Sequence, residues 1–257
     1  MSGEGGVKPL AIDLFCGLGG WTEGLLAEGY RVIGFDIEAH EYGDERYPAE
    51  LVLADVLDLH GSRFADADLI VASPPCQEYS YMAMPWSLAK AKAAAIRADT
   101  TGAELERLNR LFNACFRIQR EASEATGRHI PMVVENVRGA IPWVGRSRFN
   151  FGSFHLWGDV PALMPAPVNA SKVPGFRFDG SGGSFQTASV LEGKKGVGIG
   201  SVSWGQGSGQ RHPDDPRNTW SGSKARKAAS ARIAKIPLTL SRWIAVHYRP
   251  ASERAAA

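Results

Sequence analysis

The sequence predicts an α/β fold, a doubly wound sheet with helices on both faces, with a small basic subdomain beside it. Two observations lead to this prediction. Short apolar runs and helical segments alternate through the first 158 residues, which is typical of parallel strands joined by crossover helices. Charge also divides the chain: residues 1–144 hold 13 Lys and Arg against 21 Asp and Glu, whereas residues 145–257 hold 16 against 6. The basic second part is therefore the part that suits a polyanion.

Length and composition place the chain among globular proteins. Its 257 residues, 44% of them hydrophobic, suffice to bury a full core. No apolar run is long enough to span a bilayer and the start lacks a signal-peptide core, so we expect a cytoplasmic or otherwise intracellular protein with no membrane association. Three cysteines cannot form a disulfide framework, and the six histidines are scattered, so we expect no metal.

The first unit of the chain is a strand, a glycine turn and a helix. Residues 9–15 are apolar and strand-like, residues 16–20 read Cys-Gly-Leu-Gly-Gly, and residues 21–29 form a helical pattern closed by glycine. This unit begins nucleotide-binding α/β folds, in which the glycines let the backbone approach the ligand closely. The turn alone is equally consistent with a tight connection that binds nothing.

Acidic residues follow the next two strands. The strand at residues 30–35 ends in Asp36, roughly twenty residues beyond the glycines, where dinucleotide and adenosyl sites place a carboxylate that accepts hydrogen bonds from ribose. The strand at residues 51–54 ends in Asp55, which offers a second carboxylate at the same edge. Solvated loop carboxylates would produce the same pattern.

A cysteine follows the fourth strand. The apolar run at residues 69–71 is stopped by Pro74 and Pro75. A buried strand that halts abruptly presents the next side chain, Cys76, at the edge of the sheet, and two rigid prolines hold the backbone before it in place. For this cysteine taken alone, the alternative is an ordinary half-buried thiol.

Two helices and a fifth strand come next. After the cysteine comes a polar and aromatic loop, and residues 88–98 and 103–126 then predict helices. Cys115 lies on the apolar stripe of the longer helix, so we expect it in the core. The strand at residues 131–134 leads directly into Glu135.

Three motifs in order identify a family resemblance. Residues 13–20 read Asp-Leu-Phe-Cys-Gly-Leu-Gly-Gly, residues 74–77 read Pro-Pro-Cys-Gln with Ser80 after them, and residues 135–139 read Glu-Asn-Val-Arg-Gly. Together they resemble the cofactor-binding, nucleophile and glutamate motifs of the cytosine carbon-5 DNA methyltransferases. Each motif is short, but three in order make a chance match improbable. The resemblance is firm over residues 9–140.

The resemblance implies a Rossmann-like methyltransferase sheet with a small basic target-recognition subdomain. It divides the chain into an S-adenosylmethionine-binding catalytic domain at residues 1–158, a target-recognition region at residues 159–230 and a C-terminal helix at residues 231–250 that returns to the catalytic domain. It also implies methyl transfer from S-adenosylmethionine to carbon 5 of cytosine in double-stranded DNA, on a base flipped out of the duplex. We expect a monomer.

Residue chemistry supports the catalytic part of this resemblance. Carbon 5 of cytosine is a poor nucleophile, so the ring must be activated by addition at carbon 6, and the thiolate of Cys76 suits that step. Glu135 would hydrogen-bond or protonate the ring nitrogen and hold the exocyclic amino group.

The resemblance also implies where the cofactor binds. Phe15 would lie against the adenosyl group and the backbone of residues 18–20 against the methionine part. Asp36 would bind the ribose hydroxyls and Ile37 would pack on adenine, while residues 55–56 would read the adenine amino edge. The complete predicted set is Phe15, Gly17, Leu18, Gly19, Gly20, Asp36, Ile37, Asp55, Val56 and Pro75.

Two departures from the family pattern leave roles open. In place of a Gln-x-Arg-x-Arg element, residues 146–148 read Arg-Ser-Arg, and the strand at residues 153–157 begins later than that match predicts. Arg146 and Arg148 are candidate catalytic contacts to the flipped base and its phosphate, or else surface charges. Before the Pro-led segment that resembles the last helix of the family, residues 233–234 read Ile-Ala instead of the usual Gly-Asn.

Glycines and basic residues mark the target-recognition region. Residues 175–209 contain 11 glycines among 35 positions, interleaved with Lys194, Lys195, Phe185 and Trp204. Such loops suit close contact with a phosphate backbone and unstacked bases, although a flexible linker has the same composition. Two functional alternatives stay open: cytosine carbon-5 methylation of RNA, and a non-catalytic nucleic-acid-binding scaffold.

Overall fold

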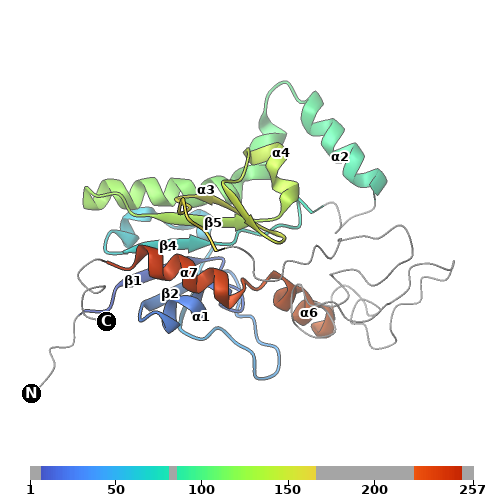
Figure 1. Ribbon diagram of the computed structural model, residues 1–257. Coiled ribbons are helices and arrows are strands. Elements are labelled where there is room, and N and C mark those ends of the chain that lie inside the picture. Colours follow the sequence, from blue (N-terminus) through green and yellow to red (C-terminus); the bar gives the residue numbers. More distant parts are fainter. Residues whose placement is uncertain (1–6, 81–85, 166–222, 251–257) are drawn as a thin grey trace, which may run out of the picture.

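The computed structural model describes residues 7–80, 86–165 and 223–250 and is built around one mixed sheet (Figure 1). The strands are β1 (Leu10–Leu14), β2 (Arg31–Asp36), β3 (Glu50–Leu53), β4 (Leu69–Ala72), β5 (Met132–Asn136), β6 (Phe149–Phe151) and β7 (Phe154–Gly158). Their order is β3-β2-β1-β4-β5-β7-β6. Strands β1 to β5 pair in parallel, whereas β7 runs antiparallel to β5 and β6. The predicted α/β sheet is confirmed, with seven strands and an antiparallel hairpin at one edge.

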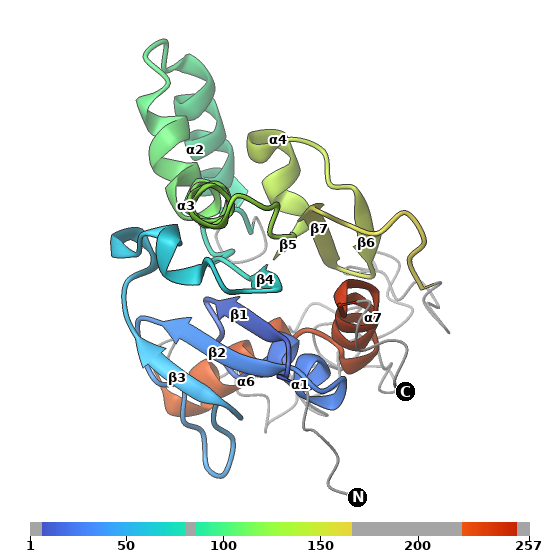
Figure 2. The ribbon, with the colours of Figure 1, turned by 90° about the vertical axis from the view of Figure 1, so that its left-hand side faces the viewer.

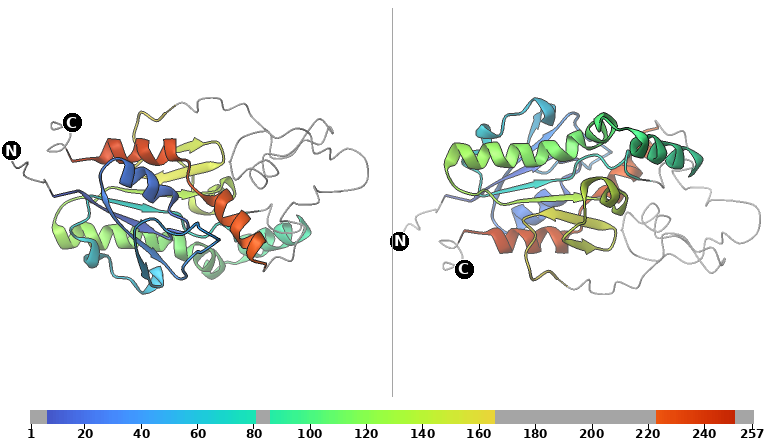
Figure 3. Two further views of the ribbon diagram at one scale, coloured as in Figure 1. Left: turned by 90° about the horizontal axis from the view of Figure 1, so that it is seen from below. Right: turned by 90° about the horizontal axis from the view of Figure 1, so that it is seen from above.

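Helices cover both faces of this sheet. They are α1 (Gly20–Ala27), α2 (Trp86–Ala98), α3 (Ala103–Thr126), α4 (Ile141–Val144), α6 (Lys224–Ala234) and α7 (Leu238–Tyr248), with the 3₁₀ turns η1 (Val56–Asp58), η2 (Gly61–Phe64) and η4 (Arg138–Ala140). Helix α3 lies on one face, and α1 and α7 lie on the other (Figures 2 and 3).

The central strands are apolar because both of their faces are covered. Every residue of β4 and β5 is buried, as expected for parallel strands between two helical layers. Successive strand residues point to opposite faces, so Ile70 belongs to the same buried apolar cluster as Ile118 of α3, whereas Val71 belongs to the cluster that contains Leu25 of α1 and Ile244 of α7.

Helix α7 approaches α1 closely because α1 carries glycine at the contact. A Cβ atom on Gly24 would lie 2.5 Å from the backbone nitrogen of Arg242. Ion pairs flank the contact, Lys235 with Glu23 at 2.5 Å and Arg242 with Glu28 at 2.6 Å. The last helix therefore packs directly on the helix that follows the glycine turn.

Most predicted elements coincide with observed ones. The strands expected at residues 9–15, 30–35, 51–54, 69–71, 131–134 and 153–157 correspond to β1, β2, β3, β4, β5 and β7, and the expected helices to α1, α2 and α3. Cys115 is fully buried, which confirms its place in the core. Strand β6 and helices α4 and α6 had no counterpart in the prediction. Residues 166–222, most of the expected target-recognition region, lie outside the described residues. In the described ranges, no helix has the length and apolar character needed to cross a membrane.

Candidate functional site

The carboxyl ends of β1 to β5 meet at one edge of the sheet because these strands are parallel. In open α/β sheets, ligands bind outside this edge. The loops that leave it carry most of the predicted site residues. Residues as distant in the chain as Phe15 and Glu135 therefore share one edge.

The loop after β1 turns sharply through left-handed backbone conformations. Phe15 has φ 57°, and Gly17 and Gly19 have φ 51° and 75°. Phe15 is the one non-glycine residue with positive φ in the described ranges, a conformation that costs roughly 1–3 kcal/mol and clusters at ligand sites. A Cβ atom on Gly19 would lie 2.5 Å from Cδ of Pro48, whereas one on Gly17 would meet nothing within 4 Å. Gly17 therefore borders open space, as close approach of a ligand requires.

The carboxylate of Asp36 joins this loop to the end of β2. Its Oδ2 accepts a hydrogen bond from the N–H of Gly17 at 2.9 Å, and its Oδ1 accepts one from the N–H of Ile37 at 2.8 Å. Nε2 of His40 lies 3.6 Å from Oδ1. Burial raises the pKa of Asp36, but the contacts with His40 and Gly17 outweigh burial, and the net pKa lies below its ordinary value. Asp36 is thus held as a carboxylate beside the glycine turn.

The loops after β2 and β3 run side by side. The N–H of Ala54 donates to the carbonyl of Asp36 at 2.9 Å. Ile37 is 72% exposed, which presents an apolar side chain at this edge. Asp55 caps η1 by accepting a backbone hydrogen bond at 2.9 Å, and Val56 next to it is buried. The structure therefore brings the residues predicted for the nucleoside together.

A buried polar chain that sequence reasoning missed lies behind the glycine turn. Oγ1 of Thr22 donates to Oδ2 of Asp13 at 2.6 Å and lies 2.6 Å from the hydroxyl of Tyr47. Gly34 leaves space for the Tyr47 ring, which a Cβ atom there would contact. Burial is the main cause that raises the pKa of Asp13 to about 8. Oδ1 of Asp13 has no hydrogen-bond partner among the described residues. At neutral pH this side chain is therefore mostly an uncharged acid.

Cys76 is half-buried on the loop after β4. This loop begins beside the glycine turn, because the N–H of Ser73 donates to the carbonyl of Leu14 at 3.1 Å. The indole nitrogen of Trp21, in the first turn of α1, donates to the hydroxyl of Ser73 at 3.0 Å. Pro75, directly before the thiol, is exposed. The predicted nucleophile therefore lies on the loop next to the predicted cofactor turn.

A tyrosine fixes the loop beyond the thiol. The N–H groups of Tyr79 and Ser80 donate to the carbonyl of Cys76 at 3.0 and 2.9 Å. The Tyr79 hydroxyl donates to the carbonyl of Leu108 at 3.2 Å and to Oδ1 of Asn109 at 3.0 Å, both on α3. The chain therefore turns immediately after the thiol and is anchored there.

Strand β5 ends in the carboxyl of Glu135 and the amide of Asn136. Glu135 is 8% exposed. Nδ2 of Asn136 donates to the carbonyl of Pro74 at 2.9 Å. Because Pro74 precedes Cys76 by two residues, this bond holds the cysteine loop against the strand end that carries Glu135.

The two candidate arginines lie at the flank of this edge. Arg146 and Arg148 are both exposed. The N–H of Arg148 donates to the carbonyl of Leu156, at 2.8 Å, and Leu156 pairs with Glu135. Arg148 therefore lies directly before β6, and β7 separates it from Glu135 on β5. Neither arginine lies in the buried part of the site.

The edge combines a glycine turn and carboxylates suited to a nucleoside with a thiol and a buried carboxyl. In the part of the chain that the structure describes, no three His, Cys, Asp or Glu side chains form a group that could hold a metal ion. The donor set suits covalent catalysis by a thiol beside a nucleoside cofactor.

A family model matches the part of the chain that carries this edge of the sheet. The family model of the C-5 cytosine-specific DNA methylases matches residues 10–139, which run from β1 to the turn after β5. The chain belongs to the C-5 cytosine-specific DNA methylase family. The resemblance noted in the sequence is thereby confirmed.

Three solved structures are similar to part of this chain, at low identity and low TM-score. They are a protein described as a DNA modification methyltransferase encoded within an E. coli prophage (23% identity, TM-score 0.35), the S. pombe Dnmt2 methyltransferase (15%, 0.32) and the Entamoeba histolytica methyltransferase EhMeth (17%, 0.31). Each match covers 52% of this chain and 33%, 36% and 39% of those chains respectively, about a third of their length. No curated protein matches the chain. The family assignment therefore rests on the family model.

Proposed function

We propose that the protein transfers a methyl group from S-adenosylmethionine to carbon 5 of cytosine in DNA, through a covalent adduct on Cys76. The hydrogen bond from Asn136 to the carbonyl of Pro74 carries this proposal, because it holds the nucleophile loop at the end of the strand that bears Glu135. Family membership supports the reaction class, and the residues at the sheet edge support the individual roles.

The loops after β1, β2 and β3 would hold the cofactor. The open space at Gly17 fits a ligand that lies against the backbone, with Phe15 beside its adenosyl group. The ionised Asp36 would accept hydrogen bonds from both ribose hydroxyls, exposed Ile37 would cover adenine, and Asp55 would accept a hydrogen bond from the adenine amino group. When bound, S-adenosylmethionine supplies an electrophilic methyl group.

Cys76 and Glu135 would activate the base. The Cys76 thiolate would add to carbon 6 while Glu135 donates a proton or a hydrogen bond to the ring nitrogen, which makes carbon 5 nucleophilic. After methyl transfer, loss of the carbon-5 proton and breakage of the bond to Cys76 would restore the aromatic ring and the thiolate. Arg146 or Arg148, both exposed at the flank, would contact the phosphate of the flipped nucleotide.

The charge of the second part supports a nucleic acid as the substrate, and DNA is the polymer we propose. Residues 145–257 carry a balance of +10, from 16 basic and 6 acidic residues, and phosphate contacts are the main source of affinity for duplexes. The same proposal includes three further points. Residues 159–230 would recognise the target sequence, and residues 231–250 would pack back onto the catalytic domain and complete it. The protein would act on duplex DNA as a monomer.

A trapping assay tests this function. The purified protein is incubated with S-adenosylmethionine and with duplex DNA that contains 5-fluorocytosine in varied contexts. Fluorine cannot leave as a proton does, so the reaction stalls with Cys76 bound to the base. We expect a denaturation-resistant adduct, detected by gel and mass spectrometry, that carries the transferred methyl group and is absent in Cys76→Ala.

Matched substrates decide between the alternatives. The same sequences are offered as duplex DNA and as RNA, with and without the cofactor. An adduct on RNA alone would replace DNA with RNA in the proposal. Binding of nucleic acid with no adduct on either polymer, and with no S-adenosylhomocysteine formed, would refute methyl transfer and favour the scaffold.

A further inference from the structure

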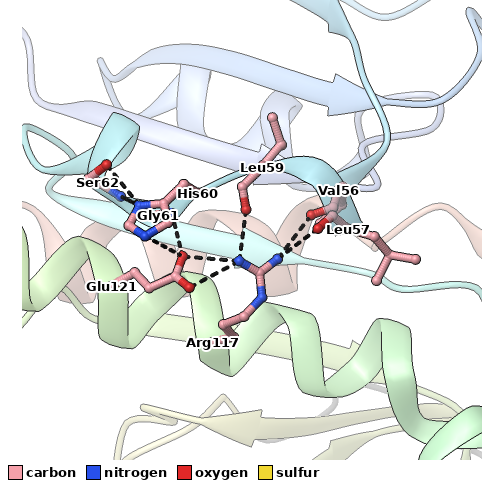
Figure 4. Close-up of polar contacts among 8 residues, drawn as sticks. All are labelled: Val56, Leu57, Leu59, His60, Gly61, Ser62, Arg117 and Glu121. Atoms are coloured by element: carbon pink, nitrogen blue, oxygen red, sulfur yellow. Dashed lines mark hydrogen bonds and ion pairs between the residues drawn. The ribbon is translucent and has the colours of Figure 1, made fainter.

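An arginine on α3 reaches across to the loop that follows β3. Figure 4 shows the guanidinium of Arg117 turned toward three backbone carbonyls of that loop. Nη1 donates to the carbonyl of Leu59 at 2.9 Å, and Nη2 donates to those of Leu57 at 3.1 Å and Val56 at 3.5 Å. The carbonyl of Val56 also accepts a hydrogen bond from the N–H of Leu59 within the turn, at 3.3 Å, so Arg117 adds donors to the carbonyls at the end of a short 3₁₀ turn. One side chain therefore ties Val56 and Leu57 of η1, and Leu59 after it, to α3.

Glu121, one helical turn further along α3, holds the guanidinium in this orientation. Both of its oxygens lie 3.1 Å from Nη1 of Arg117, and its Oε2 accepts a hydrogen bond from the N–H of Gly61 at 2.7 Å. Burial raises the pKa of Glu121, but the hydrogen bonds from Gly61 and Arg117 outweigh it and keep the pKa below its ordinary value. A Cβ atom on Gly61 would lie 2.7 Å from Cβ of Glu121, so the loop backbone lies directly on the helix.

We infer that Arg117 is a positioning residue for recognition of the adenine ring, an inference that rests on the proposed function. Asp55, which would accept the adenine amino group, is the N-cap of η1, and its carboxylate is bonded to the N–H of Leu57 in the same turn. The position of η1 therefore sets the position of the carboxylate. Arg117 holds η1 from the α3 side and acts on the cofactor only through that turn.

The geometry requires an arginine. Three carbonyls from residues 56, 57 and 59 are served by two nitrogens of one planar guanidinium whose orientation is set by Glu121. A lysine ammonium is a compact, strongly hydrated charge on a flexible stem and cannot reproduce that fork. We therefore expect Arg117→Lys to resemble Arg117→Met rather than the parent.

The experiment compares two ligands that differ only at the adenine amino group. Dissociation constants for S-adenosylhomocysteine and S-inosylhomocysteine, in which an oxo group replaces that amino group, are measured by calorimetry for the parent and both variants. We expect S-adenosylhomocysteine to bind roughly tenfold more weakly to the variants, and S-inosylhomocysteine to change by less than about twofold. In turnover assays the KM for S-adenosylmethionine should rise while kcat stays within about twofold. Arg120→Met, an exposed arginine on the same helix, is the matched control and should behave as the parent.

The ratio of the two affinities separates positioning from general stability. If the variants weaken both ligands equally, or keep the adenine preference of the parent, Arg117 has a structural role only and the inference is wrong. Arg117→Lys carries the test should Arg117→Met fail to fold. If the parent binds neither S-adenosylmethionine nor S-adenosylhomocysteine, the proposed function fails and this inference with it, whereas a parent that binds both leaves the affinity ratio to decide the inference alone.

Discussion

The two halves of the active edge are held in different ways. In the cofactor half, around the ends of β1 to β3, Asp13 and Asp36 are 1% and 8% exposed. Asp13 accepts a hydrogen bond from Thr22 of α1, and Asp36 accepts one from Gly17 in the glycine turn. In the nucleophile half, around the ends of β4 and β5, Glu135 is as buried as Asp36, at 8% exposed, but Cys76 is only half-buried and Pro75 and Arg148 are exposed. The bond from Asn136 to Pro74 joins the two strand ends there.

This difference matches the two ligands of the proposed reaction. A small cofactor binds best to groups whose positions are already fixed, because little conformational entropy is then lost on binding. A base attached to a polymer needs a thiol that it can reach. The two halves should therefore respond separately to mutation: changes near Cys76 should affect chemistry, and changes around Asp36 should affect cofactor affinity.

Removal of the thiol should produce the largest effect. Cys76→Ala should lower methyl transfer at least ~1000-fold, because the proposed mechanism requires the Cys76 thiolate to add to carbon 6. Its affinity for S-adenosylhomocysteine should stay within about twofold of the parent, since the proposed cofactor contacts come from the loops after β1, β2 and β3. Radiolabelled methyl transfer and calorimetry measure the two quantities. A parallel loss of cofactor affinity would contradict the separation of the halves.

The helix contact beneath the cofactor half should give the next largest effect. Gly24→Ala places a Cβ atom 2.5 Å from the backbone nitrogen of Arg242, so α7 must move away from α1. We expect a loss of about 3 kcal/mol in the free energy of unfolding, measured by urea denaturation. Leu26→Ala, at an exposed position of the same helix, should change it by less than about 0.5 kcal/mol. Equal losses for the two substitutions would mean that the close contact between α1 and α7 makes no particular contribution to the free energy of unfolding.

The fold was largely predictable because its central strands are short apolar runs bounded by glycine, proline or acidic residues. Strand β6 was missed because residues 149–151 form a strand only through pairing with β7, and such a short segment has no periodicity of its own. Helix α6 was also missed, because its sequence Lys-Ala-Arg-Lys-Ala-Ala-Ser-Ala-Arg-Ile-Ala holds a single large apolar residue and therefore has no helical apolar face.

The site residues also divide into those that the local sequence reveals and those that only the folded structure reveals. Cys76, Glu135 and Asp36 were found because a reactive side chain follows directly after a strand. Tyr47 and Arg117 were not found, since their partners lie far away in the chain. Arg117 bonds to carbonyls 58 to 61 positions away, and any residue type supplies a carbonyl. Long-range contacts to the backbone leave no signal in the sequence.

The buried acid behind the glycine turn predicts an unusual dependence of stability on pH. The pKa of Asp13 is raised from 3.8 to about 8 in the folded state, so between these values the folded protein binds more protons than the unfolded chain. Stability should therefore fall as pH rises from about 4 to about 8. Asp13→Asn, which resembles the uncharged acid, should lose this slope. We expect the variant to gain about 2 kcal/mol on the parent between pH 6 and pH 8, measured by urea denaturation at each pH. Parallel pH profiles would show that Asp13 is already ionised.

The smallest effect should come from the carboxylate that faces the cofactor. Asp36→Asn keeps an oxygen acceptor but turns an amide NH₂ toward the N–H of Gly17 or Ile37, and it removes the charge that would bind the ribose hydroxyls. We expect the KM for S-adenosylmethionine to rise about tenfold at unchanged kcat. Glu38→Gln, an exposed neighbour, is the control.

The pH dependence of cofactor binding sharpens this prediction. The net pKa of Asp36 lies below its ordinary value, so the carboxylate is ionised throughout the neutral and mildly acidic range. Affinity that depends on this charge is complete above the ordinary pKa of an aspartate, about 3.9, and is lost only as pH falls through the lower pKa of the folded state. Calorimetry between pH 5 and pH 8 should therefore show no titration from Asp36. A loss of affinity centred near pH 6 that Asp36→Asn abolishes would mean that burial, not the bonds from Gly17 and His40, controls this carboxyl, and that the cofactor half is less fixed than its contacts indicate.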